Sequence, residues 1–209
     1  MTGEIDVVDH FASLVLCSTG APAILIAETA RVSTQRDTDP ETSKAFVQKL
    51  MKWGHWTPFE FVDLTFYLTT SRAVANELVR HRLMSFVQES QRYVRYDKGL
   101  RVIVPEALRG TLEEEIWQAH MRDTYDVYLY LLEKGVRPED ARTVLPLATA
   151  TNMIAKMNLR EFRHFLNLRT DKPAWREMRI LANLMAEAFA KQFPDEVFLI
   201  SDVWHREDA

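Results

Sequence analysis

The spacing of apolar and polar residues along the chain predicts many helices and few strands. Apolar side chains alternate with polar ones over residues 59–69, which is typical of a strand with one buried face. Residues 11–19 form a short apolar run that indicates a buried strand. Short strands are expected within 93–104, and 148–157 fits either a strand or a helix. Helices are predicted for residues 21–31, 40–53, 71–82, 106–134 (as one helix or two), 138–144, 158–168 and 173–193.

Capping residues define the ends of several of these helices. Asp39-Pro40 is typical of an N-cap followed by proline at the first helical position. Asn158 at an N-cap with Glu161 three residues later is the pattern of a capping box. Gly135 closes the helix before it. Few strands among many helices, without regular alternation of the two, indicate an α+β fold.

The size of the chain bounds its organisation. A chain of 209 residues fits one domain with a sizeable core. We therefore expect a single domain over residues 1–209, in which 195–209 form a frayed tail. The sequence contains no internal repeat and no low-complexity linker.

Charge and cysteine content narrow the function classes. The net charge of −4 gives no overall basic field for nucleic acid. The acidic N-terminus and the absence of an apolar run near ~18 residues predict neither a signal peptide nor a membrane span. Cys17 is the only cysteine, so no intramolecular disulfide can form, which fits a reducing cytoplasm. Its apolar surroundings predict a poor nucleophile.

The glycines exclude two common nucleotide-binding motifs. Six glycines are scattered, and no Gly-x-Gly occurs, so neither a Rossmann fingerprint nor a P-loop is present. Any dinucleotide must be held by arginine, histidine and helix N-termini.

The strongest candidate for chemistry is Arg80-His81-Arg82, followed after seven residues by Ser90. Guanidinium groups bind phosphate oxygens two at a time. Consecutive helical residues point about 100° apart, so in a continuous helix Arg80 and Arg82 leave on nearly opposite sides. Either the helix stops at the motif, or the two arginines serve different ligands, as at a site between subunits. The alternative is a solvated basic helix end that complements the helix dipole.

This motif resembles the signature of flavin-dependent thymidylate synthases. Four further blocks resemble that family in the family's order, from about residue 30 to about residue 175. They are Ala-Arg-Val-Ser at 30–33, Gly-His-Trp-Thr-Pro-Phe-Glu at 54–60, Ala-Arg-Thr-Val-Leu-Pro at 141–146, and 158–169 with Asn158, Arg160, His164 and Arg169. The resemblance implies a thymidylate synthase-complementing protein fold, with a central, mostly antiparallel sheet flanked by helices.

The resemblance also implies a reaction and its partners. The family converts dUMP to dTMP by reductive methylation, with 5,10-methylenetetrahydrofolate as carbon donor and FAD reduced by NADPH. No enzyme nucleophile is implied, so Ser90 is interpreted as a substrate-binding hydroxyl. The family implies a homotetramer with active sites at subunit interfaces. Together with the sequence features above, we expect a cytoplasmic protein without a metal ion, nucleic acid or a membrane as partner.

Residue by residue, the resemblance implies two binding sets and one catalytic group. Arg169 is the catalytic candidate, because a permanently charged guanidinium can stabilise negative charge on the uracil ring. Glu60 is expected to orient its neighbours. The FAD set comprises His55, Thr57, Arg80, His81, Arg82, Gln88, Asn158, Leu159, Arg160 and His164. The dUMP set comprises Glu77, Arg80, Gln88, Glu89, Ser90, Gln91, Arg92, Arg142 and Arg169.

Two departures from the family pattern leave alternatives open. Glu77 stands where the family often has glutamine, and Gln88 where many members carry glutamate. Both lie in the expected nucleotide pocket, so a flavin-dependent dUMP hydroxymethylase is an alternative function. A further alternative is a non-catalytic oligomer that binds a nucleotide or RNA through an arginine patch. The acidic balance and the set of His55, His81, His164 and Arg169 argue against it.

Overall fold

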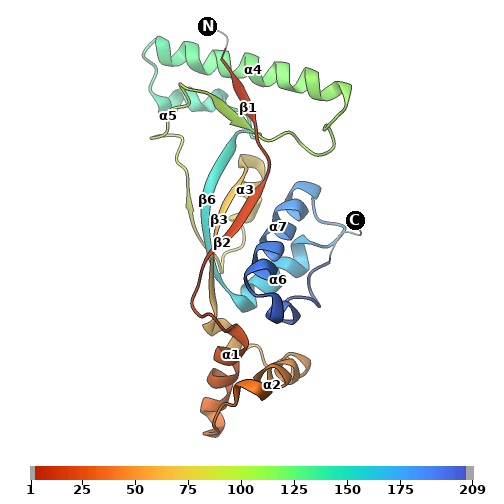
Figure 1. The fold of residues 1–209 in the computed structure, drawn as a ribbon. Helices are drawn as coiled ribbons and strands as arrows, with labels where there is room; N and C mark the ends of the chain where they lie inside the picture. The colour runs from red at the N-terminus through yellow and green to blue at the C-terminus, as the bar shows by residue number, and fades with distance from the viewer. Residues whose placement is uncertain (1–2, 206–209) are drawn as a thin grey trace. The chain divides into compact units, whose positions relative to one another are not determined.

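The fold is α+β, as the sequence predicts, and consists of one antiparallel sheet flanked by helices and one short parallel sheet (Figure 1). A computed structural model describes residues 3–205. The strands are β1 (Ile5–Val7), β2 (Phe11–Cys17), β3 (Asp63–Ser71), β4 (Ser85–Gln88), β5 (Leu100–Val102) and β6 (Ala150–Asn158). The helices are α1 (Pro22–Arg31), α2 (Pro40–Trp53), α3 (Arg72–Leu78), α4 (Leu112–Glu133), α5 (Pro138–Ala141), α6 (Leu159–Arg169) and α7 (Arg176–Gln192). Four 3₁₀ helices span Val32–Thr34, Thr57–Phe61, Arg142–Val144 and Pro194–Leu199.

The four-stranded sheet has the order β2-β3-β6-β4. Its central pair is antiparallel, because Arg72 N donates to Thr149 O at 3.0 Å while Leu159 N donates to Val62 O at 2.8 Å. Residue numbers therefore rise along β3 while those of the hydrogen-bonded partners on β6 fall, which is the pattern of antiparallel strands. Strands β1 and β5 form a separate parallel pair. The predicted, mostly antiparallel central sheet is therefore confirmed, and 148–157 is resolved as a strand.

The chain divides into two compact units. Unit 1 contains residues up to 11, 68–80 and 87–153, and unit 2 contains 12–67, 81–86 and the residues from 154 onward. The division runs through β2, β3, β4 and β6, so each unit contains part of these strands. The single domain over 1–209 stays a prediction.

Unit 1 has a tyrosine-rich core. Tyr96, Tyr125 and Tyr128 are buried together with Leu100 and Val102 of β5. Tyr125 Oη donates to the backbone carbonyl of Tyr96 at 2.6 Å, so a buried phenol finds an acceptor without leaving the apolar cluster. Helix α4 supplies two of these tyrosines and lies beside β1 (Figure 1).

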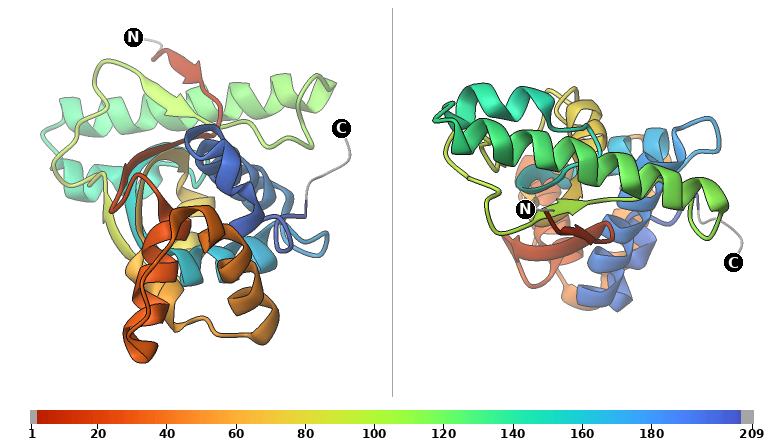
Figure 2. Two further views of the ribbon diagram at one scale, coloured as in Figure 1. Left: turned by 60° about the horizontal axis from the view of Figure 1, so that its bottom comes forward. Right: turned by 90° about the horizontal axis from the view of Figure 1, so that it is seen from above.

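Unit 2 is built from two helix pairs. Helix α1 packs against α2, and α6 packs against α7 (Figure 2). Phe162 of α6 lies between Phe66 of β3 and Phe189 of α7, with ring centroids 5.2 and 5.9 Å apart. These buried aromatic contacts fix α6, whose side chains form much of the site described below.

Several element boundaries differ from the prediction. Residues 57–61 form a 3₁₀ helix, so β3 begins at Asp63 and not at Phe59. Helix α3 ends at Leu78, because the chain then tightens into turns in which Arg80 N donates to Glu77 O at 3.1 Å. The predicted helix 106–134 begins only at Leu112, and 93–104 contains one strand, β5. Helix α7 begins at Arg176, and β4 has no counterpart in the sequence prediction.

The predicted frayed tail is wrong for the described residues. Pro194–Leu199 is a 3₁₀ helix, and Leu199, Ile200 and Trp204 are buried. Both terminal nitrogen atoms of Arg163 bind the Asp202 carboxylate, at 2.8 and 2.7 Å. Apolar burial and a bidentate ion pair therefore hold this segment. The last four residues, 206–209, lie outside the described part of the chain.

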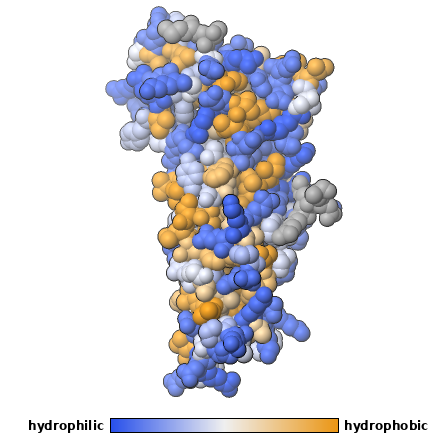
Figure 3. Space-filling model, in the orientation of Figure 1, coloured by the Kyte–Doolittle hydropathy of each residue, from blue (hydrophilic) through white to orange (hydrophobic). Residues whose placement is uncertain are grey.

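Strand β2 is also less buried than predicted. Val15 and Leu16 are 53% and 62% exposed, and Cys17 has intermediate exposure. Figure 3 shows apolar side chains at the surface in the region of this strand. Burial still raises the pKa of the Cys17 thiol, which agrees with the predicted poor nucleophile.

Candidate functional site

The two predicted binding sets fall largely into different units. Most of the FAD set lies in unit 2: His55, Thr57, His81, Arg82, Asn158, Leu159, Arg160 and His164. Most of the dUMP set lies in unit 1: Glu77, Arg80, Gln88, Glu89, Ser90, Gln91, Arg92 and Arg142. Arg169, from the dUMP set, belongs to unit 2, while Arg80 and Gln88, from the FAD set, belong to unit 1.

A pocket of about 570 Å³ lies between α1, α2 and the 3₁₀ helix that follows α2. We call it the tryptophan pocket, because Trp53 and Trp56 line it together with Phe46. His55 and Thr57 also line it, as does Arg160. Gly54 ends α2 with φ 71°, a left-handed conformation that turns the chain toward His55. The pocket thus combines apolar ring surfaces with hydrogen-bonding groups and one guanidinium.

A second pocket, of about 550 Å³, lies at the start of α6 and is called the α6 pocket here. Asn158 caps this helix, and its Oδ1 accepts from Glu161 N at 2.9 Å, as the capping pattern predicts. The other lining residues are Glu60, Leu83, Arg160, Glu161 and His164. Arg160 lines both pockets. The sequence places Arg160 and His164 one turn apart on α6, and the structure brings both to this pocket.

His81 is buried against α6 within unit 2. Its Nε2 accepts a hydrogen bond of 3.0 Å from Arg169 Nε, and its Nδ1 lies 3.7 Å from Glu161 Oε1. The ring also meets Phe165 edge to face, with centroids 5.1 Å apart. The middle residue of the Arg-His-Arg motif therefore faces the protein interior.

The surroundings of His81 keep the imidazole neutral. Burial, followed by the positive charge of Arg169 and the neighbouring His164, lowers the pKa of His81 to about 4. A neutral histidine of this kind is not the cationic phosphate ligand that the motif suggests. Its role as a direct FAD contact stays a prediction.

The two arginines of the motif lie outside the helix that precedes them. Helix α3 ends at Leu78, and both Arg80 and Arg82 are exposed. The structure therefore selects the first of the two sequence alternatives, in which the helix stops at the motif. Arg80 belongs to unit 1 and Arg82 to unit 2.

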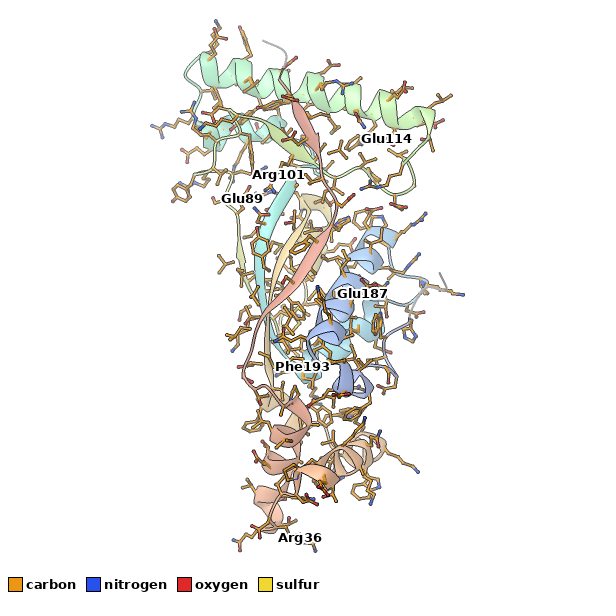
Figure 4. The ribbon with its side chains drawn as sticks, viewed as in Figure 1. Arg36, Glu89, Arg101, Glu114, Glu187 and Phe193 are labelled. Atoms are coloured by element: carbon orange, nitrogen blue, oxygen red, sulfur yellow. The ribbon has the colours of Figure 1, made fainter. Side chains whose placement is uncertain are left out.

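Glu89 is a hydrogen-bonded centre within unit 1, and its role as a ligand of the nucleotide stays a prediction. Its carboxylate accepts from Tyr96 Oη at 2.7 Å and from Asn152 Nδ2 at 3.1 Å, and it lies 3.7 Å from Arg101. Figure 4 shows Glu89 and Arg101 close together. Arg72 Nη2 donates to the Glu89 carbonyl at 2.7 Å. These contacts anchor the start of the segment that carries Ser90, Gln91 and Arg92.

The next residues of this segment are more open. Ser90 Oγ accepts from Arg92 N at 3.3 Å, which curls the chain back on itself. Arg92 Nε donates to the Glu139 carboxylate at 3.2 Å, and Arg142 Nε donates to the Glu139 carbonyl at 3.1 Å. Hydrogen bonds from Arg137 and Arg92 lower the pKa of the Glu139 carboxyl. Arg92 and Arg142, both from the predicted dUMP set, thus meet at Glu139.

Gln88 and Glu77 are half-buried in unit 1. Gln88 Nε2 donates to Thr151 Oγ1 at 3.4 Å, which ties the end of β4 to β6. The carbonyl of Glu77 accepts from Arg80 N in the turn after α3. Gln88 therefore has a structural contact in addition to its predicted ligand.

The residues present in unit 2 fit a flavin dinucleotide. Arg160 offers positive charge to a diphosphate, and the open ring surfaces of the tryptophan pocket suit a planar heterocycle. The first N–H groups of α6 and the side chains of Asn158 and His164 add hydrogen-bonding groups at the α6 pocket. The residues that line the two pockets therefore offer both features that FAD requires: positive charge for its diphosphate and apolar surface for its rings.

Sequence reasoning missed two contributors to this site. The sequence indicates Glu161 only as part of a capping box. Glu161, Phe165 and Arg169 nevertheless follow one another at intervals of four residues, which places all three on one face of α6. In the sequence, Trp56 stands out only as part of a family block, but its side chain lines the tryptophan pocket. The Arg163 guanidinium lies 4.5 Å from the centroid of the Trp56 ring. The i, i+4, i+8 spacing was the signal that could have identified Glu161.

Within residues 3–205, no helix is long and apolar enough to cross a membrane. The same residues hold no group of three or more His, Cys, Asp or Glu side chains arranged for a metal ion. The predictions about membrane and metal partners stay predictions.

The chain is similar in sequence to thymidylate synthases. A sequence model of the thymidylate synthase complementing proteins matches residues 14–195. A flavin-dependent thymidylate synthase from Geobacter sulfurreducens is 40% identical over 141 residues, which are 66% of this chain and 61% of that protein. One from Pyrococcus furiosus is 37% identical, over 69% of this chain and 61% of that protein. The chain thus spans about three fifths of the length of these two relatives. One from Synechocystis is 32% identical, over 83% of this chain and 87% of that protein.

Two solved structures are similar to nearly the whole length of this chain. The UMP/dUMP methylase PolB from Streptomyces cacaoi, bound with 5-Br dUMP, has a TM-score of 0.80 and 27% sequence identity over 98% of this chain and 100% of that chain. A second PolB structure, bound with 5-Br UMP, has the same TM-score and identity and covers 100% of both chains.

Proposed function

This chain belongs to the flavin-dependent thymidylate synthase family, and we propose that it converts dUMP to dTMP by reductive methylation. 5,10-Methylenetetrahydrofolate provides the carbon and leaves as tetrahydrofolate. NADPH provides a hydride and leaves as NADP⁺, and the solvent provides one proton. The observation that carries the proposal is the pair of pockets in unit 2. His55, Thr57, Asn158, Arg160 and His164, all from the expected FAD set, line these two pockets.

FAD is the cofactor that these pockets suit. When bound, it supplies the hydride-transfer chemistry that amino-acid side chains lack. Arg160 faces both pockets and would neutralise the diphosphate, with His55 and Thr57 on one side and Asn158 and His164 on the other. The protein's contribution is to bind and orient the cofactor and to exclude water from it.

The nucleotide is assigned to the segment that follows β4 and to Arg169. Arg92 and Arg142 converge on Glu139 and would bind the dUMP phosphate in its place. Ser90 would contribute a hydrogen bond. Arg169 would stabilise negative charge that develops on the uracil ring, as a permanently charged donor.

We further propose that the active protein is a cytoplasmic homotetramer. Large apolar side chains around the motif are exposed in the single chain, among them Leu83 at 79% and Tyr93 at 80%. Burying such side chains against further copies is favourable and would remove an exposed apolar surface. Analytical ultracentrifugation that shows only monomer would contradict this assembly.

The test is mass spectrometry of the nucleotide after incubation with FAD, NADPH, methylenetetrahydrofolate and dUMP. We expect dTMP, and no dTMP when NADPH is omitted. An Arg169→Ala variant is expected to retain flavin absorbance but lose methylation. The product 5-hydroxymethyl-dUMP would instead favour the hydroxymethylase. Protein that takes up no flavin and leaves dUMP unchanged would favour the nucleotide- or RNA-binding oligomer.

UMP is a second candidate substrate. The structural similarity to PolB extends along the whole chain, and PolB is a UMP/dUMP methylase whose solved structures include one bound with 5-Br UMP. Incubating the protein with UMP in place of dUMP under the same conditions tests this candidate. Formation of 5-methyl-UMP at a comparable rate would extend the substrate range to ribonucleotides.

A further inference from the structure

One face of α6 surrounds the imidazole of His81. Glu161, Phe165 and Arg169 follow one another at intervals of four residues, so their side chains lie on the same side of the helix. The contacts agree with this spacing. His81 Nδ1 is 3.7 Å from Glu161 Oε1, the ring packs edge to face on Phe165, and Nε2 is 3.0 Å from Arg169 Nε. All of these residues belong to unit 2.

Hydrogen-bond donors and acceptors in this row determine the tautomer of His81. A guanidinium carries only donors, so the hydrogen bond from Arg169 Nε requires a lone pair on His81 Nε2. A neutral imidazole then carries its single proton on Nδ1, the nitrogen that faces the Glu161 carboxylate. The distance of 3.7 Å exceeds that of a hydrogen bond, so the attraction between the carboxylate and this N–H acts through charge.

We propose that Glu161 is a positioning residue, which holds His81 in the Nδ1–H tautomer so that His81 can accept from, and orient, the guanidinium of Arg169. The step from orientation to catalysis rests on the proposed function of Arg169. The tautomer itself does not depend on that function, and it can be measured in protein without ligands.

The alternative tautomer explains why a carboxylate is needed. With its proton on Nε2, His81 would direct an N–H at the N–H of Arg169, and two donors would face each other in a buried place. Protonation of both nitrogen atoms would add a second positive charge beside Arg169. Burial and the charges of Arg169 and His164 oppose this, and they lower the pKa of His81 to about 4. Arg169 thus disfavours the Nε2–H form at one nitrogen, and the Glu161 carboxylate favours the Nδ1–H form at the other.

Burying the Glu161 carboxylate costs free energy, which would bring no benefit if the residue had no positioning role. Its exposed fraction is 5%, and desolvation raises the pKa of its carboxyl, an effect that His164 partly opposes. Capping the helix requires only its backbone N–H, which Asn158 accepts. The side chain is therefore not needed for the cap.

The first test measures the tautomer directly. Nitrogen-15 NMR of the imidazole rings in the full-length protein without ligands identifies which nitrogen carries the proton, and a His81→Gln variant assigns the signal. We expect Nδ1–H in the wild type and a shift toward Nε2–H in both Glu161→Ala and Glu161→Gln, because neither variant carries the negative charge that favours a proton on Nδ1. A wild-type His81 protonated on Nε2 would overturn the proposal, as would an Ala variant with an unchanged tautomer.

The second test measures the consequence for turnover. Because a misoriented catalytic group costs rate more than binding, we expect Glu161→Ala to lower kcat by about tenfold or more with a KM for dUMP within about threefold. Glu161→Gln, which also lacks the negative charge, should lower kcat to a similar extent. In an Arg169→Ala background, Glu161→Ala should cause no further loss, because residues that act as a unit are non-additive. Independent, additive losses would contradict the proposed coupling.

Glu177 provides the matched control. It is also 5% exposed and also lies in the first turn of a helix, α7. Glu177→Ala is expected to lower stability but to leave the His81 tautomer and kcat unchanged. If the wild type binds no flavin and forms no dTMP, the proposed function fails, while the NMR result still decides the role of Glu161. If Glu161→Ala alters the tautomer but leaves kcat unchanged, only the link between the tautomer and catalysis would be refuted.

Discussion

Arg160 Nη1 donates a hydrogen bond of 2.5 Å to Glu60 Oε1, which joins the start of α6 to the 3₁₀ helix after α2. Both side chains are partly exposed, and an exposed ion pair adds little to stability. Its value lies in orientation, because Arg160 lines both the tryptophan pocket and the α6 pocket. The expectation that Glu60 orients a neighbour agrees with this contact.

The Glu60–Arg160 contact leads to a prediction about flavin affinity. We expect Glu60→Ala to raise the Kd for FAD about three- to tenfold, because Arg160 would lose the acceptor that holds it between the pockets. Glu60→Gln keeps an acceptor oxygen and should stay within about twofold of wild type. Flavin fluorescence titration measures both. Equal affinities in wild type and Glu60→Ala would contradict the orienting role.

Tyr96→Phe tests whether Glu89 holds the segment of Ser90 and Arg92 in place. The Tyr96 hydroxyl donates to Glu89 Oε1 at 2.7 Å, and burial together with this carboxylate raises the pKa of Tyr96 to about 12. Losing the hydrogen bond should lower the free energy of unfolding by about 1–2 kcal/mol and raise the KM for dUMP several-fold. FAD affinity should not change.

Urea denaturation and steady-state kinetics measure these effects of Tyr96→Phe. Tyr130→Phe is the control, because Tyr130 is exposed on α4 and its ring contact with Lys134 does not need the hydroxyl. A Tyr96→Phe variant that loses stability but keeps the wild-type KM would show that the segment does not depend on Glu89.

Stability should fall between pH 6.5 and pH 4 because of His81. The folded state lowers the pKa of His81 from 6.5 to about 4, so in this range the unfolded chain binds more protons. Its protonation therefore favours unfolding as the pH decreases, by at most about 3 kcal/mol. Burial of the imidazole is the largest cause of this effect, followed by the charges of Arg169 and His164. Glu161, whose pKa is raised by burial, offsets part of it, because the folded state holds a proton there more tightly.

Urea denaturation of a His81→Gln variant at several pH values tests this dependence. The slope of unfolding free energy against pH should become flatter between pH 6.5 and pH 4. His120→Gln, at an exposed position on α4, should keep the wild-type slope. A His81→Gln slope equal to that of wild type would contradict a neutral buried histidine.

Asp202→Ala should destabilise the C-terminal segment. Arg163 is buried, and its guanidinium is held by Asp202 and by the carbonyl of Leu199. Removing the carboxylate leaves part of a buried charge unpaired, which we expect to cost about 2 kcal/mol because Asp202 is itself half exposed. Thermal and urea denaturation measure the loss. Glu187→Ala, an exposed acid on α7, should change stability by less than about 0.5 kcal/mol.

Local patterns predicted the helices whose ends carry strong caps. Asp39-Pro40 and Asn158 begin helices where expected, because a side-chain acceptor for the first N–H groups is a property of a few neighbouring residues. Boundaries without such caps shifted, as at Leu78 and Leu112. The C-terminal segment was mispredicted because its order comes from burial of Ile200 and Trp204 and from Arg163, contacts that span a long stretch of sequence.

In the candidate site, too, some features follow from local sequence and others depend on contacts between distant residues. The resemblance of the sequence blocks to the family predicts the FAD set, and five of its members line two pockets. The role of Glu89 as a ligand stays a prediction, and the structure adds that Tyr96 and Asn152 hold its carboxylate. Local sequence cannot distinguish these roles, because they depend on which distant side chain fills the hydrogen-bonding capacity of a residue.

By itself, the sequence determined the α+β class, the capped helix starts and the list of charged and aromatic groups available for chemistry, because these follow from composition and short-range periodicity. Only the tertiary structure decided that His81 is buried and neutral between Arg169 and Glu161. The protonation state of a group is set by its solvation and its nearest charges, and both arise when residues far apart in the chain, here 81 and 169, pack together.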